Sequence, residues 1–277
     1  MSKPFDFNGS AIWITGASSG IGEELAKQAA AKGARLILSA RDVSQLERVR
    51  SACIAAGAND VLVLPLDVSD FGAMQPAATT VLDHFGQIDL LVNNAGGTHR
   101  SFCVDTSMDV YRRMLDVNVL GQIALTKAVL PMMIAAGSGH VAVTSSVAGK
   151  LGSPLRTGYC AAKHAVMGFF DALRAEVADD GIAVTTILPG FVRTNIGDRA
   201  LAGDGSAFRG DNSMIENGMP VEDCVHEIVA GLEAGTAEII VAGEAELHAL
   251  ALKTNDPDQA MALLVQLGRE ARKAEPR

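Results

Sequence analysis

Three side chains in the second half of the sequence have the types and spacing that acid–base chemistry requires. Tyr159 and Lys163 are four residues apart, and Ser146 lies thirteen positions before Tyr159. Side chains at i and i+4 share one face of a helix, so the ammonium of Lys163 would lie beside the phenol and stabilise its anion. A free tyrosine has a pKa of about 10, which is too high for efficient proton transfer at neutral pH. We therefore expect Tyr159, assisted by Lys163, to transfer protons.

A glycine-rich turn near the start of the chain has the form of a nucleotide-binding loop. It runs Thr15-Gly16-Ala17-Ser18-Ser19-Gly20-Ile21-Gly22, between an apolar run and a helical pattern. Gly16 and Gly20 permit a tight turn and close backbone approach, and Gly22 lets the helix lie near the strand. The first N–H groups of that helix would face a pyrophosphate, and the helix dipole adds to the attraction. A reactive phenol beside a nucleotide indicates hydride chemistry.

The same turn also fits the nucleophile elbow of α/β-hydrolases, because Gly16-Ala17-Ser18-Ser19-Gly20 has the pattern Gly-x-Ser-x-Gly. A hydrolase elbow needs earlier strands and an oxyanion loop before it. Only fifteen residues precede Gly16. The nucleotide-binding interpretation is therefore preferred.

Short apolar runs alternate with longer helical patterns, which is typical of βαβ units on a parallel sheet. The expected strands cover residues 11–15, 35–39, 61–66, 88–92, 140–144, 182–188 and 238–241. The predicted fold class is α/β, a doubly wound, mostly seven-stranded parallel sheet (Rossmann-like) with helices on both faces. Each chemical motif follows the end of a strand. Ligands of such sheets bind outside the carboxyl ends of the strands, so the motifs should converge on one crevice.

We expect a single dinucleotide-binding and catalytic domain over residues 1–277, with two segments outside the regular alternation. Residues 195–218 are rich in Gly, Asp, Ser and Asn, which favours a mobile segment. Residues 244–277 form a C-terminal helical extension, whose second helix begins at Asp256-Pro257 with a capping residue before a proline. Its apolar stripe consists of Ala260, Leu263, Leu264, Leu267 and Ala271. Packing on the domain and contact between subunits are both compatible with this stripe.

The motifs together resemble the short-chain dehydrogenase/reductase family over residues 8 to about 243. They are the turn from Thr15 to Gly22, Asp67-Val68, Asn93-Asn94-Ala95-Gly96, Asn118, Ser146, Tyr159 with Lys163, and Pro189-Gly190 followed by Thr194. The glycine spacing matches this family and differs from the Gly-x-x-Gly-x-x-Gly of its epimerase and dehydratase relatives. The resemblance implies an oxidoreductase that transfers hydride between a nicotinamide cofactor and a carbonyl or secondary alcohol, and it makes residues 195–218 a lid over the substrate.

The resemblance also implies a role for each matching residue. The catalytic set is Asn118, Ser146, Tyr159 and Lys163. Tyr159 would be the acid or base, Ser146 would hydrogen-bond the substrate oxygen, and Asn118 would hold a water in a proton relay behind Lys163. The alternative for Asn118 is a side chain that satisfies the backbone inside a helix. The expected cofactor contacts are Gly16, Ser18, Ser19, Gly20, Ile21, Gly22, Ser39, Arg41, Asp67, Val68, Asn94, Ala95, Gly96, Tyr159, Lys163, Pro189, Gly190, Val192 and Thr194.

The residues after the second expected strand indicate a preference for NADP(H) over NAD(H). A carboxylate there would bind the ribose 2′-hydroxyl and select NAD, but the position is Ala40. Arg41 offers a guanidinium to a 2′-phosphate, and Ser39 could donate a further hydrogen bond. Asp42 is the only nearby acid, and it is better interpreted as the start of a helix capping box. Ser19 stands where many NADP-dependent relatives have a second basic residue, so Arg41 must supply most of the discrimination.

Composition narrows the expected partners and location. The net charge of −9 and the pI near 5.1 argue against nucleic acid, so a small-molecule carbonyl or alcohol is expected as substrate. The four cysteines are scattered and the six histidines show no metal-ligand spacing, which favours reduced thiols in a cytoplasmic protein and no metal. The N-terminus lacks the apolar stretch of a signal peptide. Polar residues and a proline interrupt the apolar segment 119–136, so no membrane association is expected.

Substrate identity is left open by these motifs. Residues 97–100, 153–156 and Phe191 should line the substrate pocket together with the lid. An anionic substrate would suit His99, Arg100, Arg156 and Arg193, although surface arginines are ordinary. The family resemblance implies a homodimer or homotetramer. The alternative function is a catalytically silent nucleotide-binding sensor or scaffold of the same fold, but such proteins usually lose part of the catalytic set that is complete here.

Overall fold

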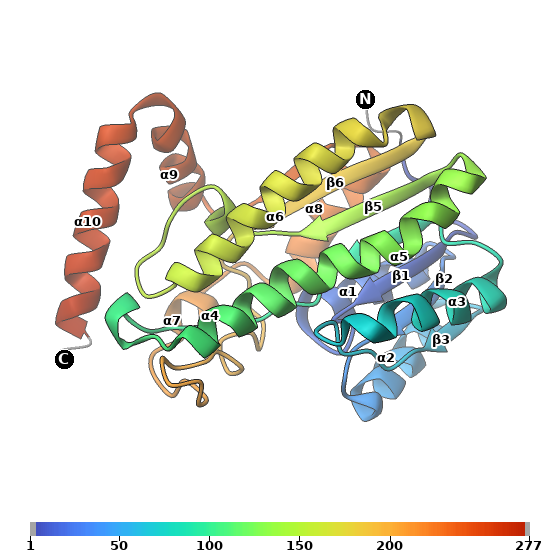
Figure 1. The fold of residues 1–277 in the computed structure, drawn as a ribbon, viewed down its shortest axis with the longest axis horizontal. Coiled ribbons are helices and arrows are strands. Elements are labelled where there is room, and N and C mark those ends of the chain that lie inside the picture. Colours follow the sequence, from blue (N-terminus) through green and yellow to red (C-terminus); the bar gives the residue numbers. More distant parts are fainter. Residues whose placement is uncertain (1–3, 275–277) are drawn as a thin grey trace.

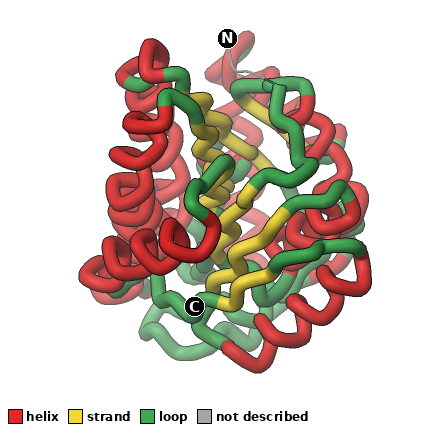
Figure 2. The backbone as a smooth tube through the Cα atoms, turned by 90° about the vertical axis from the view of Figure 1, so that its right-hand side faces the viewer, coloured by secondary structure: helices red, strands yellow, loops and turns green. Residues whose placement is uncertain are grey.

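The computed structural model describes residues 4–274 and is built on one seven-stranded sheet between two layers of helices (Figures 1 and 2). The strands are β1 Ala11–Thr15, β2 Arg35–Ser39, β3 Val61–Val63, β4 Leu90–Asn93, β5 Gly139–Thr144, β6 Ile182–Pro189 and β7 Glu238–Val241. Their order is β3-β2-β1-β4-β5-β6-β7, and all neighbours are parallel. The predicted doubly wound α/β fold is confirmed. The strand order reverses between β1 and β4, where such folds bind their ligands.

The helices divide between the two faces of the sheet. They are α1 Gly20–Ala31, α2 Val43–Ala56, α3 Met74–Phe85, α4 Met108–Leu115, α5 Gly121–Ala136, α6 Thr157–Glu176, α7 Ser213–Glu216, α8 Val221–Glu233, α9 Glu244–Asn255 and α10 Pro257–Ala274. One apolar core lies between the sheet and α1, α2 and α8, and a second lies between the sheet and α3, α5 and α6. The strands are accordingly apolar along most of their length, because both of their faces are covered.

Two strand boundaries differ from the expected ones by more than one residue. The third strand ends at Val63 instead of continuing through residue 66, although the N–H groups of Leu64 and Leu66 still donate to the carbonyls of Leu38 (3.0 Å) and Ala40 (3.1 Å) of the neighbouring segment. The fourth strand begins at Leu90, two residues later than expected. Just before it, the Asp89 backbone still bonds the Ala11 carbonyl and the His140 N–H (both 2.9 Å), and its carboxylate accepts a further hydrogen bond from the Ala11 N–H (2.7 Å).

A π-helical turn, Asp116–Leu120, joins α4 to α5 in one long helical stretch. By length and mean hydropathy, the segment Met108–Ala136 is the one helix among residues 4–274 that could cross a membrane. Core helices of soluble proteins meet the same criteria, and α5 packs on α3, β4 and β5 (Figure 1). The π-helical turn is the less ordinary feature, because such turns often occur at functional sites.

The C-terminal helices α9 and α10 form a hairpin beside the main body of the domain (Figure 1). The Asp256 carboxylate accepts a hydrogen bond from the Gln259 N–H (3.0 Å), which confirms the expected cap before Pro257. Residues 275–277, the end of the expected extension, lie outside the described residues. A Cβ placed on Gly268 of α10 would lie 3.9 Å from the Pro154 side chain. The hairpin therefore packs against the loop that precedes α6.

The segment 195–218 is irregular apart from α7 and is tied to the loop after β4. The Leu201 N–H donates to the Thr98 carbonyl (3.0 Å), and the Arg100 N–H donates to the Leu201 carbonyl (2.8 Å). Farther along, the Ser107 N–H donates to the Gly203 carbonyl (2.8 Å). These backbone bonds fix one side of the segment over the carboxyl ends of the strands. Its closure over a substrate stays a prediction.

Replacement of glycine by alanine should have opposite effects on stability at two positions. Gly121 begins α5 where it crosses the loop after β3, and a Cβ there would overlap the Val68 carbonyl. We expect Gly121→Ala to lower the free energy of unfolding by about 1–3 kcal/mol, as overpacking does. Gly168 lies on the exposed face of α6 with no atom near its Cβ position, so Gly168→Ala should raise stability by about 0.5–1 kcal/mol. Urea unfolding followed by circular dichroism tests both, and equal stability of Gly121→Ala and wild type would contradict the packing argument.

Candidate active site

A cavity of about 470 Å³ lies at the carboxyl ends of the strands and contains most of the expected site residues. The loops after β1, β4, β5 and β6 form its floor, while α6, the segment 195–218 and the C-terminal hairpin form its walls. The expected residues that line it are Gly16, Ser18, Ser19, Gly20, Ile21, Asn94, Ala95, Gly96, Asn118, Ser146, Tyr159, Lys163, Pro189, Gly190, Val192 and Thr194. The convergence predicted from the strand ends is therefore present.

The glycine turn has the geometry that its sequence predicts. Gly16 and Gly20 have φ of +66° and +58°, a region that other residues rarely adopt. A Cβ on Gly22 would overlap the Gly16 carbonyl, so only glycine lets α1 lie this close to the strand. Ser19 precedes the helix, and its side chain makes no capping hydrogen bond. The first N–H groups of α1 are therefore not capped by that side chain, and this helix end can bind an anion.

A chain of hydrogen bonds connects the ends of β1, β4 and β5 with α6. The Thr15 hydroxyl accepts from the N–H groups of Asn94 and Ala95, both at 3.0 Å. The Asn94 amide donates to the Thr15 carbonyl (3.0 Å) and accepts from the Thr144 hydroxyl (3.2 Å). Lys163 Nζ donates to the Thr144 carbonyl at 2.8 Å. The buried ammonium is thereby fixed to the same strand ends that shape the glycine turn.

Tyr159 and Lys163 lie together as their spacing predicts, and burial makes the largest contribution to the pKa of both. Lys163 Nζ is 5.7 Å from the centroid of the Tyr159 ring, over its face. Burial raises the pKa of Tyr159, against the opposing effects of the Ser146 hydroxyl and the Arg156 charge. Burial also lowers the pKa of Lys163 to about 8. Burial thus makes the largest contribution to the pKa of each group, and the expectation that the ammonium of Lys163 stabilises the Tyr159 phenolate stays a prediction.

Ser146 and Asn118 are both held by backbone groups. The Ser146 hydroxyl donates to the Pro189 carbonyl (3.2 Å) and accepts from the Ala148 N–H (3.1 Å). The Asn118 side chain lies in the π-helical turn, accepts from the Gly97 N–H (3.1 Å) and donates to the Met114 carbonyl (2.9 Å). These are the backbone-satisfying contacts that the sequence left as an alternative for Asn118. They place its amide oxygen against Gly96, at the back of the cavity.

Five expected cofactor contacts do not line the cavity. They are Gly22, Ser39, Arg41, Asp67 and Val68. Gly22 lies beneath the turn, as described. Arg41 and Asp67 follow the ends of neighbouring strands. Burial raises the pKa of the Asp67 carboxyl, but the hydrogen bonds from Ser69 and the charge of Arg41 together lower it below its ordinary value.

Ser39 is a structural residue rather than a cofactor contact. The sequence assigns it a hydrogen bond to a 2′-phosphate, but it ends β2 with 1% of its surface exposed. Its hydroxyl accepts a hydrogen bond from the Trp13 indole (2.9 Å), and its carbonyl accepts one from the Ala17 N–H (3.1 Å). These contacts hold Ser39 inside the core, so this assignment is corrected.

Asp42 caps α2, as the capping-box interpretation requires. Its carboxylate accepts from the Gln45 N–H (3.1 Å) and the Ser44 hydroxyl (2.7 Å). These bonds lower the pKa of Asp42, and the charge of Arg199 adds to them. Arg199 comes from the segment 195–218 and donates to the Ser19 hydroxyl at 3.3 Å. A guanidinium from a distant segment therefore lies beside the position where the glycine turn lacks a basic residue.

Comparison with known proteins identifies the family. A family model described as short chain dehydrogenase matches residues 10–204. Human dehydrogenase/reductase SDR family member 7 is 46% identical over 232 residues, which cover 82% of this chain and 68% of the human protein. The chain belongs to the short-chain dehydrogenase/reductase family. Bovine SDR family member 7B, another member, is 38% identical over 268 residues, which cover 95% of this chain and 82% of that protein.

Solved structures of the short-chain dehydrogenase/reductase family share this fold. One from Burkholderia phymatum, in complex with NAD, gives a TM-score of 0.82 at 27% identity and covers 92% of this chain and 96% of that chain. Levodione reductase gives a TM-score of 0.75 at 26% identity and covers 85% and 96%. The chain is therefore an oxidoreductase that acts on CH–OH or C=O groups with NAD(P).

Part of the cavity wall comes from the C-terminal hairpin, whose residues do not belong to the short-chain dehydrogenase/reductase motifs. Leu263, Leu264 and Leu267 of α10 line the cavity, so most of the predicted apolar stripe faces the site of its own domain. Glu246 of α9 accepts hydrogen bonds from the N–H groups of Phe191 (3.0 Å) and Gly243 (3.1 Å), which join the start of α9 to the turn after β6. The sequence signal for Glu246 is its position three residues after Gly243, where a glutamate can cap a helix start.

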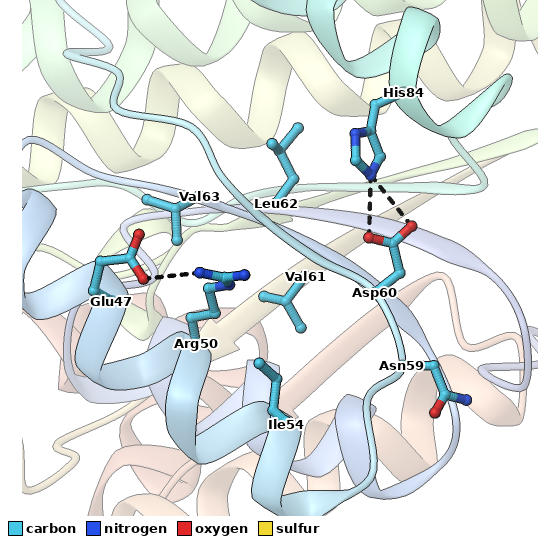
Figure 3. A pocket seen from close by; sticks show the side chains of 9 residues that line it. All are labelled: Glu47, Arg50, Ile54, Asn59, Asp60, Val61, Leu62, Val63 and His84. Carbon is cyan, nitrogen blue, oxygen red and sulfur yellow. Dashed lines mark hydrogen bonds and ion pairs between the residues drawn. The ribbon is translucent and has the colours of Figure 1, made fainter.

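A second groove, of about 390 Å³, runs along β3 at the edge of the sheet, away from the catalytic motifs (Figure 3). Its charged side chains pair with one another: Arg50 with Glu47 (3.2 Å) and His84 with Asp60 (3.1 Å). Among residues 4–274, no group of three or more His, Cys, Asp or Glu side chains is arranged to hold a metal ion. The larger cavity is therefore the candidate active site of this short-chain dehydrogenase/reductase.

The buried environment of Lys163 predicts an unusual titration. We expect its Nζ to titrate with a pKa of about 8, below the ordinary value of 10.5, because burial penalises the charged form. The ¹⁵N chemical shift of the lysine ζ nitrogens, followed against pH in the protein without cofactor, measures this pKa. Lys163→Met assigns the signal by removing it. Titration of that signal at the ordinary lysine value would show that the ammonium is not desolvated.

Proposed function

We propose that this chain is an NADP(H)-dependent oxidoreductase that interconverts a carbonyl and a secondary alcohol, with Tyr159 as the acid and base. The observation that carries the proposal is the presence of Tyr159, Ser146, Lys163 and the glycine turn in one cavity. When bound, the nicotinamide cofactor supplies the hydride. The residues of the chain bind and orient the reactants and move the proton.

The residues present fit a dinucleotide. The first turn of α1 offers N–H groups and the positive end of the helix dipole to a pyrophosphate. Gly16 and Gly20 leave room for close approach, and a Cβ on Gly20 would lie 3.2 Å from the Thr194 methyl, so the turn and the loop after β6 face one another across the site. The nicotinamide would then lie near Tyr159 and Lys163, deeper in the same cavity.

The protonation states favour Tyr159 as a proton donor. Its raised pKa keeps the phenol neutral at pH 7, so it can donate a proton to an alkoxide that develops on the substrate. Lys163, with a pKa of about 8, is still mostly charged at pH 7 and stabilises the phenolate that this transfer leaves. The Ser146 hydroxyl lies beside the phenol and would hydrogen-bond the substrate oxygen. The protonation states of the free site are therefore the ones from which carbonyl reduction would start.

The cavity walls suit a substrate with an apolar body. Besides the three leucines of α10, the walls include Leu151 before α6 and Met214 of α7. Such walls bind by excluding water and impose few directional demands. The substrate proposed is therefore a small carbonyl or alcohol compound with an apolar body.

Replacement of the tyrosine hydroxyl tests the catalytic role directly. We expect Tyr159→Phe to reduce kcat for carbonyl reduction by about 10²–10⁴-fold while cofactor still binds, since it removes the transferable proton and little else. NADPH absorbance decay with a panel of carbonyl compounds measures turnover, and fluorescence titration measures binding. The matched control is Tyr111→Phe, because the Tyr111 hydroxyl hydrogen-bonds Thr157 (2.8 Å) outside the cavity lining. Near-normal kcat in Tyr159→Phe would rule out this acid.

The proposed preference for NADP(H) rests on four observations. Ala40 provides no carboxylate to repel a 2′-phosphate, and Asp42 is committed to its cap. Arg41 is exposed at the end of β2, and Arg199 adds a second guanidinium next to Ser19. Two cations beside an adenosine ribose would favour the phosphorylated cofactor.

Cofactor titrations test this preference. A charge-assisted hydrogen bond contributes about 1.5–3 kcal/mol, so Arg41→Ala should weaken NADPH binding by roughly 10- to 150-fold and leave NADH nearly unchanged. Ala40→Asp should favour NADH. Arg50→Ala is the control, since Arg50 pairs with Glu47 in the separate groove. Equal wild-type affinities for the two cofactors, or equal losses in Arg41→Ala, would leave only an unspecific nicotinamide dinucleotide.

The proposed enzyme is a homo-oligomer. Exposed apolar side chains along the helical stretch from α4 to α5, including Met108, Leu115 and Leu120, support this part of the proposal. A two-fold contact through these helices would be the default symmetry of a soluble oligomer.

A further inference from the structure

Arg156 is a cavity-lining arginine whose hydrogen-bonding groups are unused. It immediately precedes α6, three positions before Tyr159, and its side chain lines the same cavity as the phenol. Its backbone N–H and carbonyl bond Ser153 and Cys160, but among residues 4–274 its guanidinium makes no hydrogen bond or ion pair. Its one specific contact is the face of Phe191, 5.4 Å from the ring centroid. Five N–H donors therefore lack protein acceptors.

The surroundings of Arg156 offer no anion that could take these donors. Glu246 is the one carboxylate among the residues that line the cavity, and both of its oxygens accept backbone N–H groups, from Phe191 and Gly243. It lies beyond ion-pair distance of Arg156. Burial lowers the pKa of Arg156, and the charge of Arg100 lowers it further, while Tyr159 and Glu246 act in the opposite direction. A partly desolvated guanidinium without an acceptor is unfavourable, and an anionic ligand would relieve that cost.

The other three side chains that suggested an anionic substrate do not offer donors to the cavity. His99 is buried, its Nε2 accepts the Gly158 N–H (2.9 Å), and burial lowers its pKa, so it is a neutral ring. Arg100 donates to the Asp211 carbonyl (2.6 Å). Arg193 is exposed, donates to the Glu216 carbonyl (3.0 Å) and does not line the cavity. Of the four side chains that suggested an anionic substrate, Arg156 alone presents free donors to the cavity.

Resting on the proposed carbonyl chemistry, we propose that Arg156 binds a carboxylate or phosphate group of the substrate and makes this enzyme selective for anionic carbonyl compounds. Arg156 is the residue before α6, three positions from Tyr159, both side chains line the same cavity, and the charge of Arg156 acts on the phenol. A single small molecule can therefore reach both: its carbonyl at Tyr159 and its anionic group at Arg156. The guanidinium also packs over the Phe191 ring, 5.4 Å from its centroid. The apolar side chains of α10 would cover the rest of the molecule.

A matched set of ketones tests this selectivity. The probes are 4-oxo-4-phenylbutanoate, its uncharged methyl ester, and the phosphate monoester of a phenyl ketone of similar chain length. For wild type, we expect kcat/KM for one or both anions to exceed that for the ester by roughly 10- to 150-fold, the range of one charge-assisted hydrogen bond. The carboxylate and phosphate arms distinguish the two chemistries. In Arg156→Leu the ratio should fall to about one, and in Arg156→Lys to an intermediate value, because a point charge lacks the bidentate fork.

The ratio of anion to ester separates substrate binding from an effect on Tyr159. If Arg156 only adjusted the phenol, Arg156→Leu would slow all three substrates equally and leave the ratio unchanged, which would overturn the proposal. Arg193→Gln is the matched control, since it removes a nearby arginine outside the cavity, and its ratio should equal that of wild type. An equal fall in Arg193→Gln would indicate a general charge effect and would also overturn the proposal.

Failure of this inference can be distinguished from failure of the proposed function. Tyr159-dependent reduction of the ester without any preference for the anions would remove Arg156 as a selectivity residue and leave the carbonyl chemistry intact. If no ketone of the set were reduced, the dissociation constants of the carboxylate and the ester for the NADPH complex of Tyr159→Phe, measured by calorimetry, decide the question. The proposal is supported if the carboxylate binds more tightly than the ester and if adding Arg156→Leu weakens its binding to that of the ester. Equal dissociation constants of the carboxylate and the ester in Tyr159→Phe overturn it.

Discussion

The active site depends on one line of hydrogen bonds that runs across the ends of three strands. Thr15, Asn94 and Thr144 bond one another in turn, and the Thr144 carbonyl then receives the ammonium of Lys163. Each bond uses a group that has no partner in the regular ladder, because it lies at or beyond the end of its strand. The spacing of the glycine turn from β4 and the position of the ammonium are therefore set together. Loss of one member would leave buried polar groups unpaired on both sides, which is costlier than the loss of one bond.

The cavity joins a part fixed by the sheet to a part supplied by the tail. The strand ends determine the cofactor side, where glycines permit close approach and few side chains intrude. The substrate side is formed by α7, the loop before α6 and the leucines of α10. Glu246 links the two parts, because its carboxylate binds backbone N–H groups of both the turn after β6 and the start of α9. Substrate selection can therefore change through the hairpin without disturbing the strand ends.

The sequence predicts those features that depend on local pattern. The period of apolar residues gives seven strands with boundaries within about three residues, and turn chemistry gives the φ of Gly16 and the cap at Asp42. What it cannot supply are contacts between distant segments. The sequence suggests that Ser39 could bind a cofactor phosphate, whereas in the structure its hydroxyl accepts a hydrogen bond from the Trp13 indole. The spacing of Tyr159 and Lys163 predicts that they meet, but not that burial shifts the pKa of both groups. The hydrogen bond from Arg199 to Ser19 joins residues 180 positions apart, and no sequence motif predicts it.

The charge of the cavity is opposite to that of the chain. The chain carries −9 overall, yet Lys163, Arg156 and Arg199 line the cavity with Glu246 as the one lining carboxylate. Burial lowers the pKa of both Lys163 and Arg156, so each cation is less stable in the empty cavity than in water. An anion bound beside them reverses that penalty and must raise their pKa values. Because such coupling is reciprocal, protonation of Lys163 must in turn strengthen the binding of an anionic cofactor. In the proposed mechanism, the proton that Lys163 holds near pH 8 would thus be linked both to phenolate stabilisation and to the affinity for an anionic cofactor.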